Sequence, residues 1–99
     1  MGRFLVYKNP DGEGYLLDVQ ADLLNHLNTR VVVPLLPAES APMPATTLNP
    51  LYEIEGKRVV MATQFMAAIP ASMLRVPVHN LADSRNEITA ALDLLFQGF

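Results

Sequence analysis

The 99-residue sequence contains no cysteine. Disulfide bonds, thiolate catalysis and zinc sites with cysteine ligands are therefore excluded, and the absence is compatible with a reducing compartment. No stretch approaches the roughly 20 apolar residues that span a bilayer, and the first residues lack an apolar segment of signal-peptide length. We therefore expect a cytoplasmic protein with no membrane partner.

Basic residues are also scarce. The chain has 7 lysines and arginines against 10 aspartates and glutamates, which gives a formal net charge of −3. A protein that holds a phosphate backbone needs clustered lysine and arginine, and here these residues are scattered along the chain. We therefore expect no direct contact with nucleic acid, and a basic peptide suits the sign of the charge better as a partner.

Motifs for catalysis and for cofactor binding are missing as well. His26 and His79 share no motif, and neither has a second ligand at metal-binding spacing. Ser40, Ser72 and Ser84 do not lie in a nucleophile elbow, and no glycine-rich loop carries the lysine that binds phosphate. The carboxylates are no more than any small acidic protein offers. We predict no catalytic residue, no metal, no cofactor and no enzymatic activity.

Apolar residues, in contrast, are abundant: 51% of the chain is hydrophobic and only 17% is charged. The length predicts one domain covering residues 1–99. A domain this small buries only about 60–65% of the surface of its unfolded chain, so surplus apolar side chains often face a partner. A two-fold dimer is the simplest such partner, because it uses one patch on both subunits.

The first third of the chain predicts β structure. Residues 3–8 and 15–20 are rich in β-branched and aromatic residues and are separated by turn formers, which is typical of a hairpin. Residues 21–28 form a short apolar segment that we interpret as a turn. Residues 29–37 predict a strand, and because proline cannot donate to a ladder, Pro34 places it at an edge, at a bulge or at its end.

A second hairpin is predicted further along. In residues 51–63, Leu51, Glu53 and Glu55 alternate with Tyr52 and Ile54, Glu55 and Gly56 make the turn, and residues 59–61 form the returning strand. Residues 64–73 are ambiguous between a helical turn and the start of a strand. Residues 74–81 predict the last strand, although Pro77 interrupts it.

The C-terminal segment predicts a helix over residues 84–97. Ser84 and Glu87 have the spacing of a capping box, and Gly98 is the type of residue that ends a helix. An apolar stripe at helical spacing follows: Ile88, Ala91, Leu92, Leu95 and Phe99. Strands followed by one helix predict a small α+β protein, with a barrel or paired sheets and the helix on one face.

The end of this helix carries more apolar surface than one face requires. Leu94 and Phe96 lie on the flanks of the stripe, and Phe99 follows within three residues. Chain termini are usually frayed and polar unless something holds them. Two interpretations stay open: Phe96 and Phe99 complete the core or a dimer interface, or they contact a foreign partner.

Several segments, taken in order, resemble the CcdB toxin family. They are YLLDVQADLL, NTRVVVPLLP, IPASML with HNLADSRNEI, and a terminal helix that ends in Phe-x-Gly-hydrophobic. The resemblance implies an α+β protein of mostly antiparallel β structure. Its core is an SH3-like barrel (CcdB/MazF-like) with a small extra sheet and a C-terminal α-helix, assembled as a homodimer.

The resemblance also implies a function. Members of the family are toxins of type II toxin–antitoxin systems that are not enzymes. They bind the A subunit of DNA gyrase and trap the gyrase–DNA cleavage complex. The second partner is a CcdA-like antitoxin with a disordered segment that folds on binding, and the segments PAESAPMPA and NPDGEG are expected to contact it.

Gyrase-binding residues are carried over from the family by position. Asp93 stands where asparagine is usual, Gln97 where the prototype has tryptophan, and Phe99 where it has isoleucine. Tryptophan supplies large, rigid contact area, whereas glutamine loses that area and adds side-chain entropy that binding must freeze. The implied set is Leu23, Leu24, Asp93, Phe96, Gln97, Gly98 and Phe99.

These departures leave alternatives. Either gyrase poisoning survives with an altered partner preference, which we favour, or the chain binds gyrase weakly. A degenerate member would bind its antitoxin and no longer poison gyrase. An endoribonuclease on the same barrel fold is a further alternative, and it requires a basic patch for RNA. That patch would have to unite Arg3, Arg30, Arg58, Arg75 and Arg85.

Overall fold

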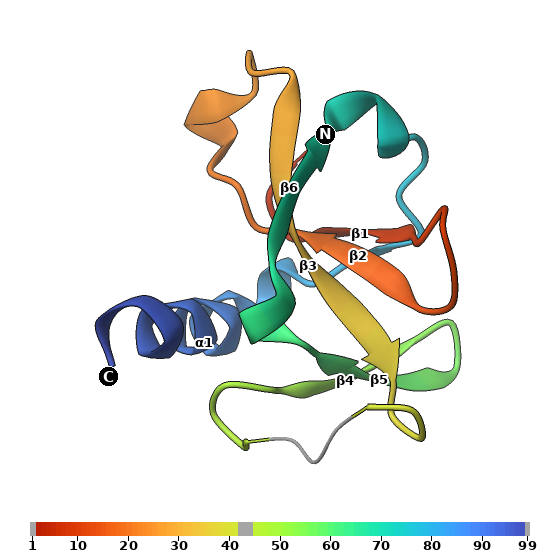
Figure 1. The fold of residues 1–99 in the computed structure, drawn as a ribbon, viewed down its shortest axis with the longest axis vertical. Coiled ribbons are helices and arrows are strands. Elements are labelled where there is room, and N and C mark those ends of the chain that lie inside the picture. The colour runs from red at the N-terminus through yellow and green to blue at the C-terminus, as the bar shows by residue number, and fades with distance from the viewer. Residues whose placement is uncertain (1, 42–44, 99) are drawn as a thin grey trace.

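The computed structural model describes residues 2–41 and 45–98, and Phe99 therefore lies outside the described residues. Within them the chain forms seven strands, four 3₁₀ turns and one α-helix (Figure 1). The strands are β1 (Leu5–Lys8), β2 (Tyr15–Asp18), β3 (Thr29–Pro37), β4 (Leu51–Ile54), β5 (Lys57–Met61), β6 (Ala67–Pro70) and β7 (His79–Asn80). The helical elements are η1 (Asp22–Leu24), η2 (Thr63–Phe65), η3 (Ala71–Met73), η4 (Ala82–Ser84) and α1 (Arg85–Gln97).

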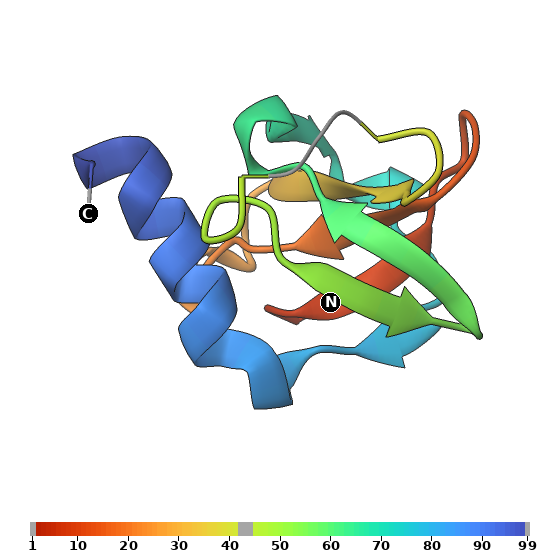
Figure 2. The ribbon, with the colours of Figure 1, turned by 90° about the horizontal axis from the view of Figure 1, so that it is seen from below.

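The strands form one antiparallel sheet in the order β4-β5-β3-β2-β1-β7. β6 pairs with the first half of β3, whose second half pairs with β5. The sheet curls into a nearly closed barrel, and α1 lies along one side of it (Figure 2). The predicted α+β fold is confirmed. The expected small extra sheet is represented by the β3–β6 pairing, which is a branch of the same sheet.

β3 is an interior strand, so the expectation that Pro34 marks an edge, a bulge or an end was wrong. Pro34 lies opposite Leu16 of β2, and its carbonyl accepts a hydrogen bond of 2.9 Å from the Ala62 N–H. The N–H and C=O of one strand residue point to the same neighbour. On this side of β3, pairing with β6 ends at Val32 and pairing with β5 begins at Leu35. Pro34 lies in the gap between these two pairings, so the N–H that it lacks is not needed there.

The second hairpin is confirmed. Glu55 and Gly56 connect β4 to β5, and both have positive φ angles, 53° and 78°. Two consecutive residues of positive φ are the requirement of a type I′ turn, whose twist matches that of the flanking strands. Glycine meets this requirement at no steric cost.

Three predicted strands are shorter in the structure, and one of them, β2, ends at Asp18 instead of Gln20. β1 begins at Leu5 because Phe4 has a φ of 75°, which breaks the extended conformation. Of the predicted strand at residues 74–81, only His79–Asn80 pairs regularly with β1. Pro77 has no N–H to donate, and before His79 the Val78 N–H donates to the Val6 carbonyl at 2.7 Å while Leu74 packs in a core cluster with Tyr7.

The main core fills the barrel and continues under α1. Ile88 and Ala91 of α1 are completely buried against it, as the predicted apolar stripe requires. Burying one isoleucine contributes about 1.5–3 kcal/mol, so this contact fixes the first two turns of the helix. The barrel side of the core contains Val6, Leu17, Val33, Leu35, Ile54, Val59 and Met61.

The helix spans Arg85–Gln97, close to the predicted 84–97, but the capping box is not formed. Ser84 makes no side-chain cap hydrogen bond, because it is the last residue of η4 and its backbone (φ −102°, ψ 18°) is not extended. An N-cap residue that binds the first N–H groups needs extended backbone instead. The predicted stop is confirmed: Gly98 has a φ of 83° and donates to the Leu94 carbonyl. Among residues 2–41 and 45–98, no helix has the length and apolarity to cross a bilayer.

Candidate functional site

The C-terminal end of α1 leaves its apolar side chains uncovered. Its early residues dock on the barrel, whereas the last turn projects away from the sheet (Figures 1 and 2). Leu95 is 36% exposed and Phe96 is 70% exposed, while Leu92 and Leu94 are half-buried. A large aromatic side chain in water at this level is unusual enough to indicate a contact surface.

Polar neighbours surround Phe96. Gln97 is exposed and its Nε2 donates to Oδ1 of Asp93, one turn earlier, at 3.5 Å. Gly98 is exposed and in the left-handed conformation, which directs the chain out of the helix. Asp93, Phe96, Gln97 and Gly98 therefore lie together at one end of α1, and Phe99 lies outside the described residues.

The other two predicted residues lie in the turn between β2 and β3. Leu23 is 88% exposed and Leu24 is 40% exposed, and both belong to η1, none of whose residues is buried. Leu27, three residues later, is 41% exposed. Residues 21–29 are all exposed, so three leucines face solvent on one short segment that has no apolar anchor of its own.

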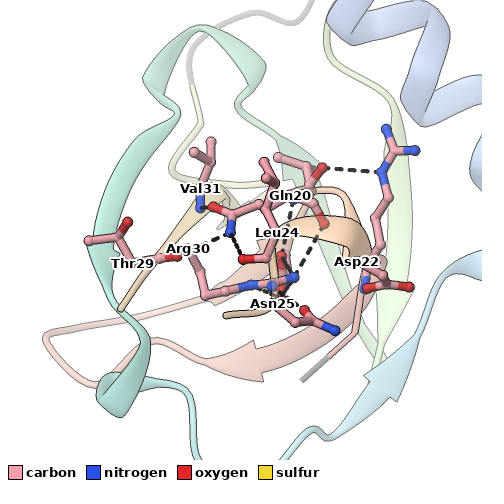
Figure 3. Close-up of polar contacts among 10 residues, drawn as sticks. Gln20, Asp22, Leu24, Asn25, Thr29, Arg30 and Val31 are labelled. Carbon is pink, nitrogen blue, oxygen red and sulfur yellow. Dashed lines mark hydrogen bonds and ion pairs between the residues drawn. The ribbon is translucent and has the colours of Figure 1, made fainter. Parts of the chain in front are cut away.

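A buried polar cluster lies beneath this segment (Figure 3). Asp18 accepts two hydrogen bonds of 2.9 Å from the Arg30 guanidinium, and both side chains are fully buried. The same guanidinium donates to the Gln20 carbonyl at 3.2 Å and to the side-chain oxygen of Asn25. A bidentate pair of this kind is rigid, because the planar donor fork matches the carboxylate.

Within one chain the structure does not bring all predicted residues together. η1 and the C-terminal end of α1 occupy separate parts of the molecule (Figure 1). The site is therefore two exposed apolar groups: Leu23 and Leu24 on η1, and Phe96 with its polar neighbours on α1. Neither group has the convergent titratable side chains of a catalytic centre. The arrangement is suited to binding a protein surface.

Comparison with known families decides what kind of protein this is. The model of the CcdB protein family matches residues 3–98. The chain belongs to the CcdB family. This is a toxin family of toxin–antitoxin systems, so the resemblance inferred from the sequence is confirmed.

Solved structures of low sequence identity share the fold of this CcdB-family chain. The Mycobacterium tuberculosis toxin MazF-mt6 superposes with a TM-score of 0.75 at 15% identity, covering 95% of this chain and 96% of that one. An endoribonuclease in complex with its cognate antitoxin, from a mycobacterial species, gives 0.73 at 16% identity and covers 97% and 94%. At such identities the likeness shows the CcdB/MazF-like fold alone.

The five arginines considered as RNA contacts do not form one patch in this CcdB-family structure. Arg30 is completely buried in its ion pair and cannot contact RNA. Arg58 lines a groove of about 510 Å³ between the β1–β2 turn and the β4–β5 hairpin, together with Lys8 and Lys57. Arg75 lines a second groove of about 650 Å³, which shares Lys8 with the first. The five arginines considered from the sequence are therefore not a single binding surface.

Tyrosines near the barrel surface have perturbed hydroxyls. Tyr15 donates to Glu55 Oε1 at 2.8 Å, and burial followed by this bond raises the pKa of Tyr15. Burial, and then the Glu87 carboxylate, raise the pKa of Tyr52 more strongly. The Tyr52 hydroxyl is buried, and within the described residues it has no partner at hydrogen-bond geometry. Both hydroxyls stay protonated at neutral pH and supply no general base.

The buried cluster is the feature that sequence reasoning missed. Asp18 is one of several carboxylates that no motif distinguishes, and Arg30 is one of the five arginines considered as RNA contacts. A signal did exist: each is a charged residue inside an apolar strand, and the two strands are consecutive in the sequence, although the register that brings the two side chains together is seen only in the fold. A buried charge must be paired, so Asp18 and Arg30 were each other's best partner.

Proposed function

We propose that this chain is the toxin of a type II toxin–antitoxin pair. It binds the A subunit of DNA gyrase, traps the gyrase–DNA cleavage complex, and acts by binding rather than catalysis. The observation that carries the proposal is Phe96, 70% exposed at the end of a helix whose other end is anchored in the core. An aromatic residue presented in this way has the properties of a binding hot spot.

The proposed gyrase-binding residues are those of the two exposed groups: Leu23, Leu24, Asp93, Phe96, Gln97, Gly98 and Phe99. Gyrase is cytoplasmic, and we place the toxin in the same compartment. Gln97 offers less contact area than the tryptophan that the family prototype has at this position. Phe96 is the aromatic residue of the described surface. We therefore expect poisoning to persist with a changed partner preference.

The active form is proposed to be a homodimer. η2 packs against α1, and Phe65 of η2 is 51% exposed. A two-fold contact would cover this apolar surface on both subunits at once. The dimer would also present two copies of each exposed apolar group to gyrase.

The antitoxin is proposed to be a CcdA-like protein with a disordered segment that folds on binding. The groove that contains Lys8, Lys57 and Arg58 lies between the two sequence segments expected to contact it. Asn9 and Gly12 to Gly14 line one wall, and Pro37 and Glu39 line the other. The complex of a mycobacterial endoribonuclease with its cognate antitoxin is one case of a toxin of this fold held by an antitoxin.

The decisive experiment is a cleavage-trapping assay. The purified toxin is incubated with host gyrase, ATP and supercoiled plasmid, and covalent complexes are trapped with detergent. Linear DNA at micromolar toxin is expected. A chain lacking residues 97–99 serves as the tail variant, with its dimer checked by light scattering. Absence of linear DNA with the wild-type chain and matched gyrase would refute the proposal.

A second candidate function is an endoribonuclease, favoured by the basic side chains Lys8, Lys57 and Arg58 in one groove. Glu13 and Glu39 also line this groove and offset part of its positive charge, so RNA would have to contact the three basic side chains directly. The test is cleavage of a long messenger RNA by the pure protein, repeated with Lys57→Ala. Specific cleavage that the substitution abolishes would replace gyrase poisoning as the function.

A further inference from the structure

The segment that carries Leu23 and Leu24 has a defined conformation but no apolar anchor. Residues 21–29 are all exposed, and η1 contains no buried residue. Local hydrogen bonds from Leu24 to Ala21 (3.0 Å), from Asn25 to Asp22 (3.1 Å) and from Leu27 to Leu24 (3.1 Å) are solvent-accessible. Exposed turns with few apolar contacts open at low free energy, so something else must hold this one.

The buried cluster reaches the segment at several points (Figure 3). Gln20 Nε2 donates to the carbonyls of Leu24, at 3.2 Å, and Thr29, at 3.1 Å, and so spans the base of the turn. Gln20 Oε1 accepts from the Val31 N–H at 3.0 Å. The side-chain amide of Gln20, a residue only 7% exposed, therefore ties the middle of the turn, at Leu24, to the start of β3.

Asn25 is the second connection. Its side-chain oxygen accepts from the Arg30 Nη1 group, and Arg30 is held in turn by two bonds to Asp18 in β2. The sheet thus fixes Asp18, Asp18 fixes the guanidinium, and the guanidinium fixes the exposed residue directly after η1. This is a continuous chain of hydrogen bonds from the barrel to the turn that presents the leucines.

We infer that Gln20 and Asn25, with the Asp18–Arg30 ion pair, are positioning residues that hold residues 21–28 in the conformation that binds gyrase. The inference rests on the proposed function. Neither positioning side chain needs to touch the partner. An ordered turn has already lost the conformational entropy that binding would otherwise remove, so the leucines dock at a smaller cost.

The test compares three variants of the full-length chain. Asn25→Ala removes the acceptor of Arg30 at an exposed position and is expected to fold. Asn25→Asp keeps an acceptor oxygen there. Asn28→Ala is the matched control, because Asn28 lies in the same segment and its side chain makes no hydrogen bond among residues 2–41 and 45–98.

Two readouts are measured on each variant. Amide hydrogen exchange of Leu24, Asn25 and Leu27 reports the order of the turn, and calorimetry with the purified A subunit of gyrase reports affinity. Asn25→Ala is expected to speed exchange at these three amides and to weaken binding by about tenfold, with the melting temperature little changed. Asn25→Asp and Asn28→Ala are expected to stay within about twofold of the wild-type affinity.

The outcomes separate this inference from the proposed function. If the wild-type chain binds the A subunit and Asn25→Ala binds equally well, or leaves exchange unchanged, the positioning role is overturned while the proposed function stands. If the wild-type chain does not bind the A subunit at all, the proposed function and the gyrase role of this turn are both overturned. A loss of affinity in Asn28→Ala equal to that in Asn25→Ala would also overturn the positioning role.

Discussion

The guanidinium of Arg30 and the carboxylate of Asp18 lie 2.8 Å apart in an ion pair whose two side chains are fully buried. The pair joins the start of β3 to the end of β2 beneath an exposed turn. It consequently links the stability of the barrel to the position of Leu23 and Leu24. Because the ion pair is buried, removing one of its two charges should lower the free energy of unfolding.

We expect Arg30→Met to lower the free energy of unfolding by about 3–5 kcal/mol, because the Asp18 carboxylate is then buried without a partner. Urea denaturation at fixed protein concentration measures the change. In the double variant Asp18→Leu/Arg30→Met no charge stays buried, and part of the loss should be recovered. A cost below about 1 kcal/mol for the single change would contradict the ion pair described here.

Gly14→Ala should be one of the most damaging small substitutions in the chain. A Cβ at Gly14 would lie 2.3 Å from the Leu35 carbonyl oxygen, and its φ of +83° disfavours any side chain. A loss above about 2 kcal/mol in thermal or urea unfolding is expected. Gly12→Ala, with nothing within 4 Å of the new methyl group, is the matched control and should stay within about 0.5 kcal/mol of wild type.

The Tyr52 hydroxyl predicts a loss of stability at high pH. Burial, and then the Glu87 carboxylate, raise its pKa above the ordinary value of 10.0. The unfolded chain therefore releases this proton before the folded one. The stability that comes from keeping this proton in the folded state is fully present below about pH 10. It is lost as the pH rises from there through the folded pKa, so the free energy of unfolding falls. Tyr52→Phe should flatten the fall in unfolding free energy above about pH 10.

The same substitution has a consequence at neutral pH. The Tyr52 hydroxyl lies near the Glu87 carboxylate but makes no bond of good geometry within the described residues, so Tyr52→Phe should change the free energy of unfolding at pH 7 by less than about 1 kcal/mol. Tyr15→Phe is the contrasting control, because it removes a real bond to Glu55 and should cost about 0.5–1.5 kcal/mol. Equal effects of the two substitutions on urea unfolding would show that the Tyr52 hydroxyl is satisfied.

Gln97→Trp should strengthen binding to the A subunit of gyrase by about tenfold, if the proposed function holds. Tryptophan adds rigid contact area beside the exposed Phe96 and freezes less side-chain entropy than glutamine. Calorimetry on the purified proteins measures the change. Ala90→Trp, at an exposed position of α1 away from the terminal turn, controls for added hydrophobicity and should leave affinity unchanged.

Local patterns predicted most of the fold because they depend on neighbours in the sequence. The strand at residues 29–37 and the turn at Glu55 and Gly56 follow from β-branched composition and backbone geometry, and both are confirmed. The prediction from Pro34 was wrong because the effect of a proline in a strand depends on which strand lies beside it. Where β3 changes partners an interior proline is tolerated, and a single sequence does not reveal that junction.

The start of α1 and the candidate site also depend on packing partners that the sequence alone does not reveal. Ser84 and Glu87 match the capping spacing, but Ser84 is the last residue of η4 and its backbone is not extended, which leaves the serine unable to cap. The exposure of Phe96 was one of two interpretations, since periodicity cannot tell a solvent-facing flank from a core contact. The Asp18–Arg30 pair depends on strand register, which only the folded chain supplies.

The most direct test of the account replaces the exposed aromatic residue. Phe96→Ser and the control Val76→Ser each remove one exposed apolar side chain, 70% and 74% exposed, and Val76 lines the groove that contains Lys8 and Arg75, which includes no residue of α1. Calorimetric titration against the A subunit of gyrase should show a loss of at least about 2 kcal/mol for Phe96→Ser and none for Val76→Ser, with both dimers intact. Unchanged affinity in Phe96→Ser would contradict the claim that gyrase covers this surface.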